Sequence, residues 1–168
     1  MLSRKVLLID YQKCTGCRAC EALCSLYHYG EVNPARGHIR VVKSFEGGVD
    51  LPLTCQQCED ALCEKACLMG AISRNRDTGA MLIDQSRCIG CRICIYTCPF
   101  GGIHVDPITC ETSKCDLCKG DPQCIAFCVT GALRYERMDR VDISRKIDVL
   151  QMICNIESGR LTKPKGGR

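Results

Sequence analysis

Apolar residues alternate with polar ones in several short runs, and this pattern predicts strands. The segment GAISRNRDTGAMLID (residues 70–84) predicts two strands around a hairpin turn at Asp77, Thr78 and Gly79. FGGIHVD (100–106) predicts another strand that ends at Asp106. GHIRVVKSFEGGVDLPL (37–53) predicts a surface hairpin, and ALRYE (132–136) a further strand.

The C-terminal segment follows a helical period instead. Ile143, Ile147, Leu150 and Cys154 recur at the spacing of one helix face, between a possible N-cap at Asp142 and an end at Gly159. This helix could pack on its own domain or dock on a partner, and the tail beyond it is expected to be mobile.

Four cysteine groups interrupt this pattern and contain 16 of the 18 cysteines. Each group begins with C-x2-C and ends with a gap of three residues before its fourth cysteine. The groups are Cys14, Cys17, Cys20 and Cys24; Cys55, Cys58, Cys63 and Cys67; Cys88, Cys91, Cys94 and Cys98; and Cys115, Cys118, Cys124 and Cys128. The third group, followed by Pro99, matches the bacterial iron–sulfur pattern C-x2-C-x2-C-x3-C-P.

Two other uses of cysteine fit less well. A disulfide scaffold requires an oxidising compartment, and the N-terminal segment has no apolar leader pattern, so we expect a cytoplasmic protein without membrane insertion. Structural zinc sites usually join two C-x2-C pairs across a spacer. The four regular groups therefore favour iron–sulfur clusters, which would also form much of a core that contains no tryptophan.

The formal charge of +4 counts every thiol as neutral. Four oxidised [4Fe–4S] clusters with their thiolates would lower the charge to about −4. Lys and Arg are also scattered along the chain, so we expect no nucleic-acid partner.

In the matched pattern, the fourth cysteine binds the cluster of another motif. Two schemes satisfy this rule, because the outer motifs can pair and the inner motifs can pair, or the first can pair with the second and the third with the fourth. Spacing alone leaves both open.

The motif order, with NPARGHIRVVK, PLTCQQCEDALC, RCIGCRICIYTCPFGGI and KCDLCKGDPQCIAFCVTGAL, resembles the four-cluster ferredoxin-type electron-transfer subunits of molybdenum and tungsten oxidoreductases. The resemblance covers residues 5–136 and includes the small subunits that accompany tungsten aldehyde oxidoreductases and class II benzoyl-CoA reductase. It departs from the family where Ser25, Leu68 and Val129 replace a proline after the fourth cysteine.

The resemblance implies the nested pairing, and with it an α+β fold of two nested ferredoxin-like units. Residues 1–54 and 106–136 would form the outer unit with the hairpin insert, 55–105 the inner unit, and 137–168 the C-terminal helix and tail. The implied ligands are Cys14, Cys17, Cys20 and Cys128 for cluster 1; Cys24, Cys115, Cys118 and Cys124 for cluster 2; Cys55, Cys58, Cys63 and Cys98 for cluster 3; and Cys67, Cys88, Cys91 and Cys94 for cluster 4.

No nucleophile–base pair, phosphate loop or dinucleotide motif is present in the sequence. We therefore expect a non-catalytic subunit that relays single electrons between a larger catalytic subunit and an external carrier. That carrier would be a flavin- or NAD(H)-linked subunit or a soluble ferredoxin. The alternatives are a free-standing polyferredoxin, serving for example carbon monoxide dehydrogenase or hydrogenase, and an iron–sulfur redox sensor.

Two cysteines and three histidines remain outside the motifs. We interpret Cys110 and Cys154 as small buried apolar residues rather than ligands. His28, His38 and His104 stand alone in the sequence, and none is assigned to a metal.

Overall fold

The structure, a computed structural model, describes residues 4–44 and 49–138. The expected C-terminal helix and Cys154 lie outside these residues, as does the turn at Gly47-Gly48. The strands are β1 (Lys5–Ile9), β2 (Ile39–Ser44), β3 (Val49–Thr54), β4 (Ile72–Arg74), β5 (Met81–Ile83), β6 (Ile103–Val105), β7 (Thr112–Lys114) and β8 (Leu133–Arg137). The helices are α1 (Ala19–Tyr29), α2 (Leu62–Lys65), α3 (Ile93–Thr97) and α4 (Gln123–Ala126), with 3₁₀ turns η1 (Pro34–Arg36) and η2 (Leu117–Gly120).

All strands of the described residues pair antiparallel in twos. The pairs β2–β3, β4–β5 and β6–β7 are hairpins between neighbours in the chain. The pair β1–β8 instead joins the two ends of the described chain, with Leu7 opposite Tyr135. The strands from β2 to β7 therefore lie, in sequence, between two strands that are partners in space.

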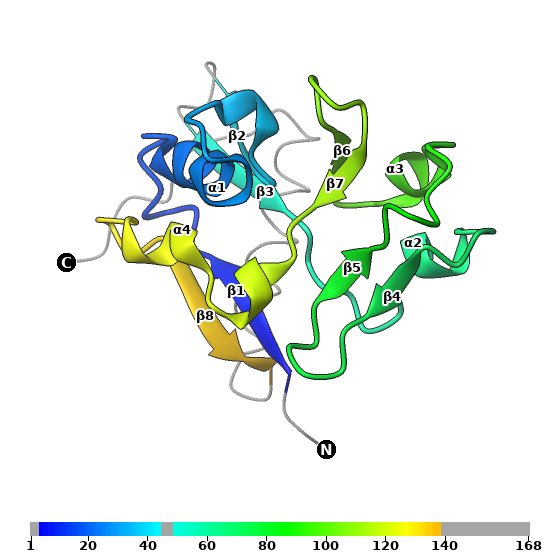
Figure 1. The fold of residues 1–168 in the computed structure, drawn as a ribbon. Coiled ribbons are helices and arrows are strands. Elements are labelled where there is room, and N and C mark those ends of the chain that lie inside the picture. Colours follow the sequence, from blue (N-terminus) through cyan, green and yellow to red (C-terminus); the bar gives the residue numbers. More distant parts are fainter. Residues whose placement is uncertain (1–3, 45–48, 139–168) are drawn as a thin grey trace.

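The elements divide between two sides of the molecule (Figure 1). Helices α1 and α4 lie with the β1–β8 pair on one side, and α2 and α3 lie with the β4–β5 pair on the other. The first side has a core that includes Leu7, Ile39, Leu117 and Leu133, and several motif cysteines pack in it. The second has a smaller core around Ala61, Ile72 and Met81. This is a small α+β fold of short strand pairs and short helices.

The hairpin β2–β3 is attached through buried carboxylates. Glu21 on α1 is fully buried, and its Oε1 accepts a hydrogen bond from the backbone N–H of Val41 at 2.6 Å. Arg36 in η1 donates from Nε to Asp106, which follows β6, at 2.8 Å. Because both carboxylates lie in the interior, these bonds fix the hairpin and the η1 turn that precedes it more firmly than surface pairs would.

The hydrophobic pattern correctly predicted the hairpins β2–β3 and β4–β5 and the strands β6 and β8. It did not predict β1 or β7.

No helix within 4–44 and 49–138 combines the length and apolar character needed to cross a bilayer.

Candidate metal centres

The four cysteine motifs share one backbone conformation. The residue before the second cysteine has a positive φ in every motif, at Gly16 (65°), Gln57 (51°), Gly90 (69°) and Leu117 (60°). A left-handed residue at this position bends the C-x2-C segment into a loop, so that both cysteines can face a common centre. Because two of the four are not glycine, the sequence showed this feature for only half of the motifs.

Short helices carry the later cysteines of each motif. Cys20 and Cys24 lie on α1, Cys63 lies on α2, Cys94 on α3 and Cys124 on α4. Helix α1 begins after a left-handed Arg18 and ends at Gly30, whose N–H bonds the carbonyl of Leu26. The fourth cysteine follows the third by four residues, on α1 in the first motif and just after the short helix in the other three, so it lies further along the chain direction than the first three cysteines.

A cavity of about 340 Å³ brings together cysteines of the second and third motifs. Cys55, Cys58 and Cys63 line it together with Cys98, and the rest of its wall is largely apolar. Burial raises the pKa of the Cys58 and Cys63 thiols, and neighbouring negative charge at Cys55 and Cys98 raises it further. Cys98 thus lies with the cysteines of the preceding motif.

The reciprocal arrangement occurs at a second, narrower cavity of about 80 Å³. Cys67, the last cysteine of the second motif, lines it with Cys88, Cys91 and Cys94 of the third. Burial, followed by the charge of Cys88, raises the pKa of Cys94 to about 11. Exposed apolar side chains surround this site, and Leu68 is 90% exposed.

Cysteines of the first and last motifs meet in the larger core. Cys20, Cys24, Cys115, Cys124 and Cys128 all belong to it. Burial raises the pKa of Cys124, and the charges that raise it further are those of Cys115, Cys118, Cys24 and Cys20. Burial likewise raises the pKa of Cys14, with smaller contributions from Asp50, Cys17 and Cys128.

Backbone N–H groups point at several of these sulfurs. The N–H groups of Ala71 and Gly102 donate to Cys67 and Cys98 at 3.3 and 3.4 Å. The N–H of His38 donates to Cys24 at 3.1 Å. Such bonds stabilise a thiolate and influence the reduction potential of a bound cluster.

The spacing of the thiols differs from that of a single-ion site. A zinc ion with Zn–S bonds of about 2.3 Å brings its sulfurs to within about 4 Å of one another. Among the described residues, the donor groups whose atoms all lie within 4.8 Å contain no three motif cysteines. The donor sets consist of thiols, which are the ligands that hold iron–sulfur clusters, and no three of these thiols are gathered as closely as one zinc ion would hold them.

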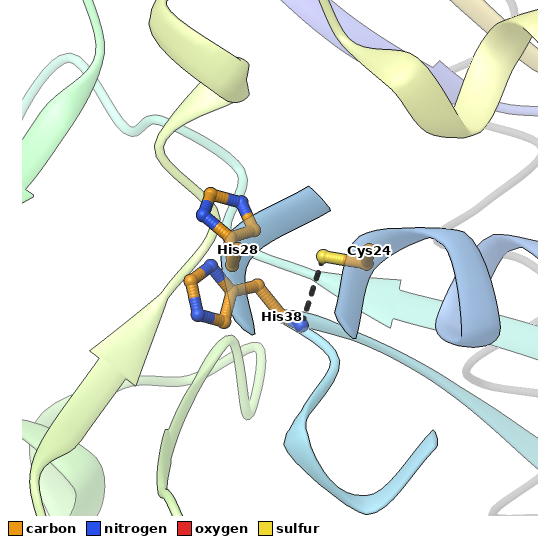
Figure 2. A group of neighbouring side chains, drawn as sticks. All are labelled: Cys24, His28 and His38. Atoms are coloured by element: carbon orange, nitrogen blue, oxygen red, sulfur yellow. Dashed lines mark hydrogen bonds between the residues drawn. The ribbon is translucent and has the colours of Figure 1, made fainter. Parts of the chain in front are cut away.

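The histidines are not isolated, contrary to the sequence interpretation. The rings of His28 and His38 stack with centroids 4.2 Å apart, next to Cys24 (Figure 2). Nε2 of His28 lies 3.3 Å from Asp116 Oδ1 and 3.9 Å from Cys118 Sγ. Burial lowers the pKa of His28, but hydrogen bonds to Asp116, Cys118 and Cys24 outweigh it and raise the pKa.

Donor atoms of Cys24, His28 and His38 lie within 4.8 Å of one another, which is close enough for a single ion. His28 follows Cys24 by four residues on α1, and this one-turn spacing was the signal in the sequence that could have revealed the contact.

The interpretation of Cys110 as buried is wrong, because the thiol is exposed. Asp106 accepts hydrogen bonds from the N–H groups of Ile108 and Thr109, which closes a surface turn, and Cys110 ends that turn with φ 61°. Sequence reasoning treated a turn position as a core position.

Comparison with known proteins agrees with these motifs. Residues 49–138 match the model of the 4Fe-4S dicluster domain, and residues 11–30 match that of a 4Fe-4S binding domain. The polyferredoxin-like subunit of aliphatic sulfonate oxidoreductase from Pyrococcus furiosus is 39% identical over 73% of this chain and 70% of its own. The electron transport protein HydN of Escherichia coli is 35% identical over 77% of this chain and 86% of its own.

The thiosulfate reductase electron transfer subunit PhsB of Salmonella typhi is 30% identical, over 86% of this chain and 82% of its own. A chain of the benzoyl coenzyme A reductase active-site complex BamBC is 29% identical with a TM-score of 0.49, over 89% of both chains. On the motif match and these identities, the chain belongs to the 4Fe-4S dicluster domain family.

Proposed function

We propose that this chain is a non-catalytic electron-transfer subunit that holds four [4Fe–4S] clusters and serves a larger catalytic oxidoreductase subunit. The observation that carries the proposal is the meeting of Cys98 with Cys55, Cys58 and Cys63, because a motif whose fourth thiol serves another motif belongs to a multi-cluster protein. Three relatives named as subunits or electron transport proteins support it.

The ligand sets we propose are those of the nested scheme. The cavities formed by the inner motifs and the shared core of the outer motifs favour this scheme over pairing of neighbouring motifs. The sets are Cys14, Cys17, Cys20 and Cys128; Cys24, Cys115, Cys118 and Cys124; Cys55, Cys58, Cys63 and Cys98; and Cys67, Cys88, Cys91 and Cys94. When bound, such clusters accept and release single electrons.

The protein's own contribution is to bury the thiols and to arrange the four sites in series. Burial is the main cause of the raised pKa of Cys124, Cys115 and Cys94, and charge at Cys20, Cys55 and Cys63, respectively, adds to it. Each of these charge interactions joins two different proposed ligand sets, which supports a series in the order first, second, third and fourth. Of the motif thiols, Cys17 and Cys91 are exposed, and they belong to the two terminal sets.

Iron and acid-labile sulfide analysis tests the cluster number. Anaerobically prepared protein should contain about sixteen of each per chain. About twelve would mean that one site is empty, and stoichiometric zinc would contradict the proposal.

Single substitutions test the pairing. Cys98→Ser should alter the cluster held by Cys55, Cys58 and Cys63, whereas Cys67→Ser should alter the one held with Cys88, Cys91 and Cys94. Anaerobic EPR of the two variants should therefore show two different altered signals, and the same altered signal in both would refute the nested scheme.

Co-purification from the native host tests the partner. A dedicated subunit should elute with a larger catalytic chain. A monomer that exchanges electrons with several unrelated enzymes would instead identify a free-standing polyferredoxin.

A further inference from the structure

A cationic cleft of about 700 Å³ lies where the β4–β5 turn meets the β1–β8 pair and η2. In Figure 1 the start of β1 and the β4–β5 turn come together at the lower edge of the molecule. Among the residues that the structure describes, Asp77 is the single acidic one in the lining of the cleft. Its cationic residues are Arg4, Lys5, Arg74, Arg76 and Lys119.

These cations lack acidic partners within 4–44 and 49–138, where none of the five forms an ion pair. Arg74 is held by carbonyl groups, including that of Gly79 at 2.8 Å, so its charge is not neutralised. Lys5 lies over the ring of Tyr135, with 5.3 Å from Nζ to the ring centroid. Among the described residues, Asp77 in the lining and Glu59 near Arg4 offset only part of this charge, so the cleft has an excess of positive charge.

Arg4 gives a second indication of an anionic ligand. Its Nε is buried and has no hydrogen-bond partner among the described residues. Burial, and then the charge of Arg74, lowers the pKa of Arg4. An anion in the cleft would reduce the repulsion between the guanidinium groups of Arg4 and Arg74, and it would accept a hydrogen bond from Arg4 Nε.

The cleft also lies against two cysteine motifs. Arg74 donates from Nη2 to the backbone carbonyl of Cys58, and Lys119 directly follows Cys118. These cysteines belong to the third and second ligand sets proposed above. A molecule bound in the cleft would thus lie beside the middle of the series, where an electron could enter or leave.

The chain's own C-terminal segment is poorly suited to fill the cleft, because residues 139–168 carry seven Lys or Arg and four Asp or Glu. The charge of about −4 expected for the loaded protein would repel an acidic partner from most of the surface. The cationic cleft would instead attract an acidic partner. The difference in charge between the cleft and the rest of the surface would fix both the position and the orientation of that partner.

We propose that the cationic cleft docks a small acidic electron-carrier protein. The proposal rests on the electron-transfer function proposed above and names the partner and its docking surface. One electron passes between the carrier and the chain, so that one is oxidised as the other is reduced, and no atom or proton is transferred.

Stopped-flow kinetics with an acidic [2Fe–2S] ferredoxin as the probe tests this docking. Transfer is followed in whichever direction is spontaneous, over a range of ionic strength. The double variant Lys5→Gln/Arg76→Gln removes two exposed cations that contact no motif cysteine. Its second-order rate constant should fall about tenfold at low salt, and the difference should disappear at high salt.

The control neutralises two cations outside the cleft. Lys13 and Lys65 are exposed and paired with Asp10 and Asp60, so Lys13→Gln/Lys65→Gln changes the net charge equally. Its rate constant should stay within about twofold of the wild type. An equal loss in both double variants would overturn the proposal, because the effect would then come from net charge alone.

Two further measurements separate other outcomes. Inorganic pyrophosphate should compete with ferredoxin, and pyrophosphate binding without any effect on transfer would identify a small-anion site instead. If Lys5→Gln/Arg76→Gln releases the catalytic subunit and leaves the ferredoxin rate unchanged, the cleft is a subunit interface and the proposal is wrong.

Reduction by methyl viologen radical, a cation, distinguishes failure of the docking surface from failure of the proposed function. Both double variants should be reduced as fast as the wild type. A wild-type protein that accepts no electrons from viologen would refute the electron-transfer function itself.

Discussion

Gly102 packs between Cys98 of the third motif and the backbone of Cys55 of the second. We expect Gly102→Ala to damage selectively the cluster site that these two cysteines share. The N–H of Gly102 donates to Cys98 Sγ at 3.4 Å. A Cβ at this position would lie 2.7 Å from both the Cα and the N of Cys55. Carbon contacts normally lie at about 3.5–4.0 Å, so the two segments would have to separate by about 1 Å. Both neighbours are backbone atoms, and neither can rotate away.

Overpacking of this kind costs about 1–3 kcal/mol. If this steric contact is absent from the transition state for cluster loss, the variant should release iron to a chelator about 5- to 150-fold faster than the wild type under anaerobic conditions. EPR should locate the change at the cluster held by Cys55, Cys58, Cys63 and Cys98.

Gly101→Ala is the matched control for that experiment. Gly101 has φ 58°, and a Cβ there would meet nothing within 4 Å, so this variant introduces backbone strain without a clash. It should accelerate release without a selective change in one EPR signal. The steric reasoning fails if Gly102→Ala releases iron within twofold of the wild-type rate, or if the two variants cannot be distinguished.

Two other predictions follow from the surroundings of the sites. Asp106 is 1% exposed, and although burial raises its pKa, hydrogen bonds from Thr109, Arg36 and Ile108 lower the pKa from 3.8 to about 2. This stabilisation of about 2 kcal/mol is complete above pH 3.8 and is lost as the pH falls towards 2, so Asp106→Asn should lose it in full at pH 7. Anaerobic thermal unfolding of Asp106→Asn should show it as a lower midpoint, and an unchanged midpoint would contradict the assignment. Cys110 is exposed and outside the motifs, so Cys110→Ser should keep the wild-type iron content; loss of four irons would show that Cys110 is a ligand.

The sequence predicted the parts of the fold that repeat a simple pattern. The hairpin β4–β5 has two short runs rich in apolar residues on either side of a turn at Asp77, Thr78 and Gly79, and both features predict the same structure. Strand β7, Thr112–Lys114, has no apolar residue. It forms a strand because it pairs with β6, and all three of its residues are buried. A three-residue polar strand of this type is determined by tertiary contacts and gives no periodic signal.

The histidines show a different limit of sequence reasoning. His28 and His38 are ten residues apart, and their rings stack because Gly37 allows η1 to approach α1 closely. A Cβ at Gly37 would lie 2.8 Å from the carbonyl oxygen of Glu21. The contact thus depends on the path of the chain between the two residues, which neither histidine determines by itself.

Gln57 and Leu117 explain how unequal motifs can form equivalent loops. Both occupy the left-handed position that glycine holds in the other two motifs, and both are fully buried. A non-glycine residue in this conformation costs about 1 kcal/mol. Gln57 offsets the cost with two hydrogen bonds: its Nε2 donates to the carbonyl of Cys115 at 2.8 Å, and its Oε1 accepts from the N–H of Met81 at 2.7 Å.

The bond to Cys115 also has a consequence for function, because it ties the loop of the second motif to that of the fourth. The two motifs with a widened gap between their second and third cysteines are the two whose loops contact each other in this way. They contribute Cys55 and Cys115, whose charges interact between the third and second ligand sets. In place of the glycine of the simpler motifs, the second motif has a side chain that joins the two halves of the proposed electron path. Gln57 therefore replaces glycine at the point where the second and third ligand sets have to be held at a fixed separation.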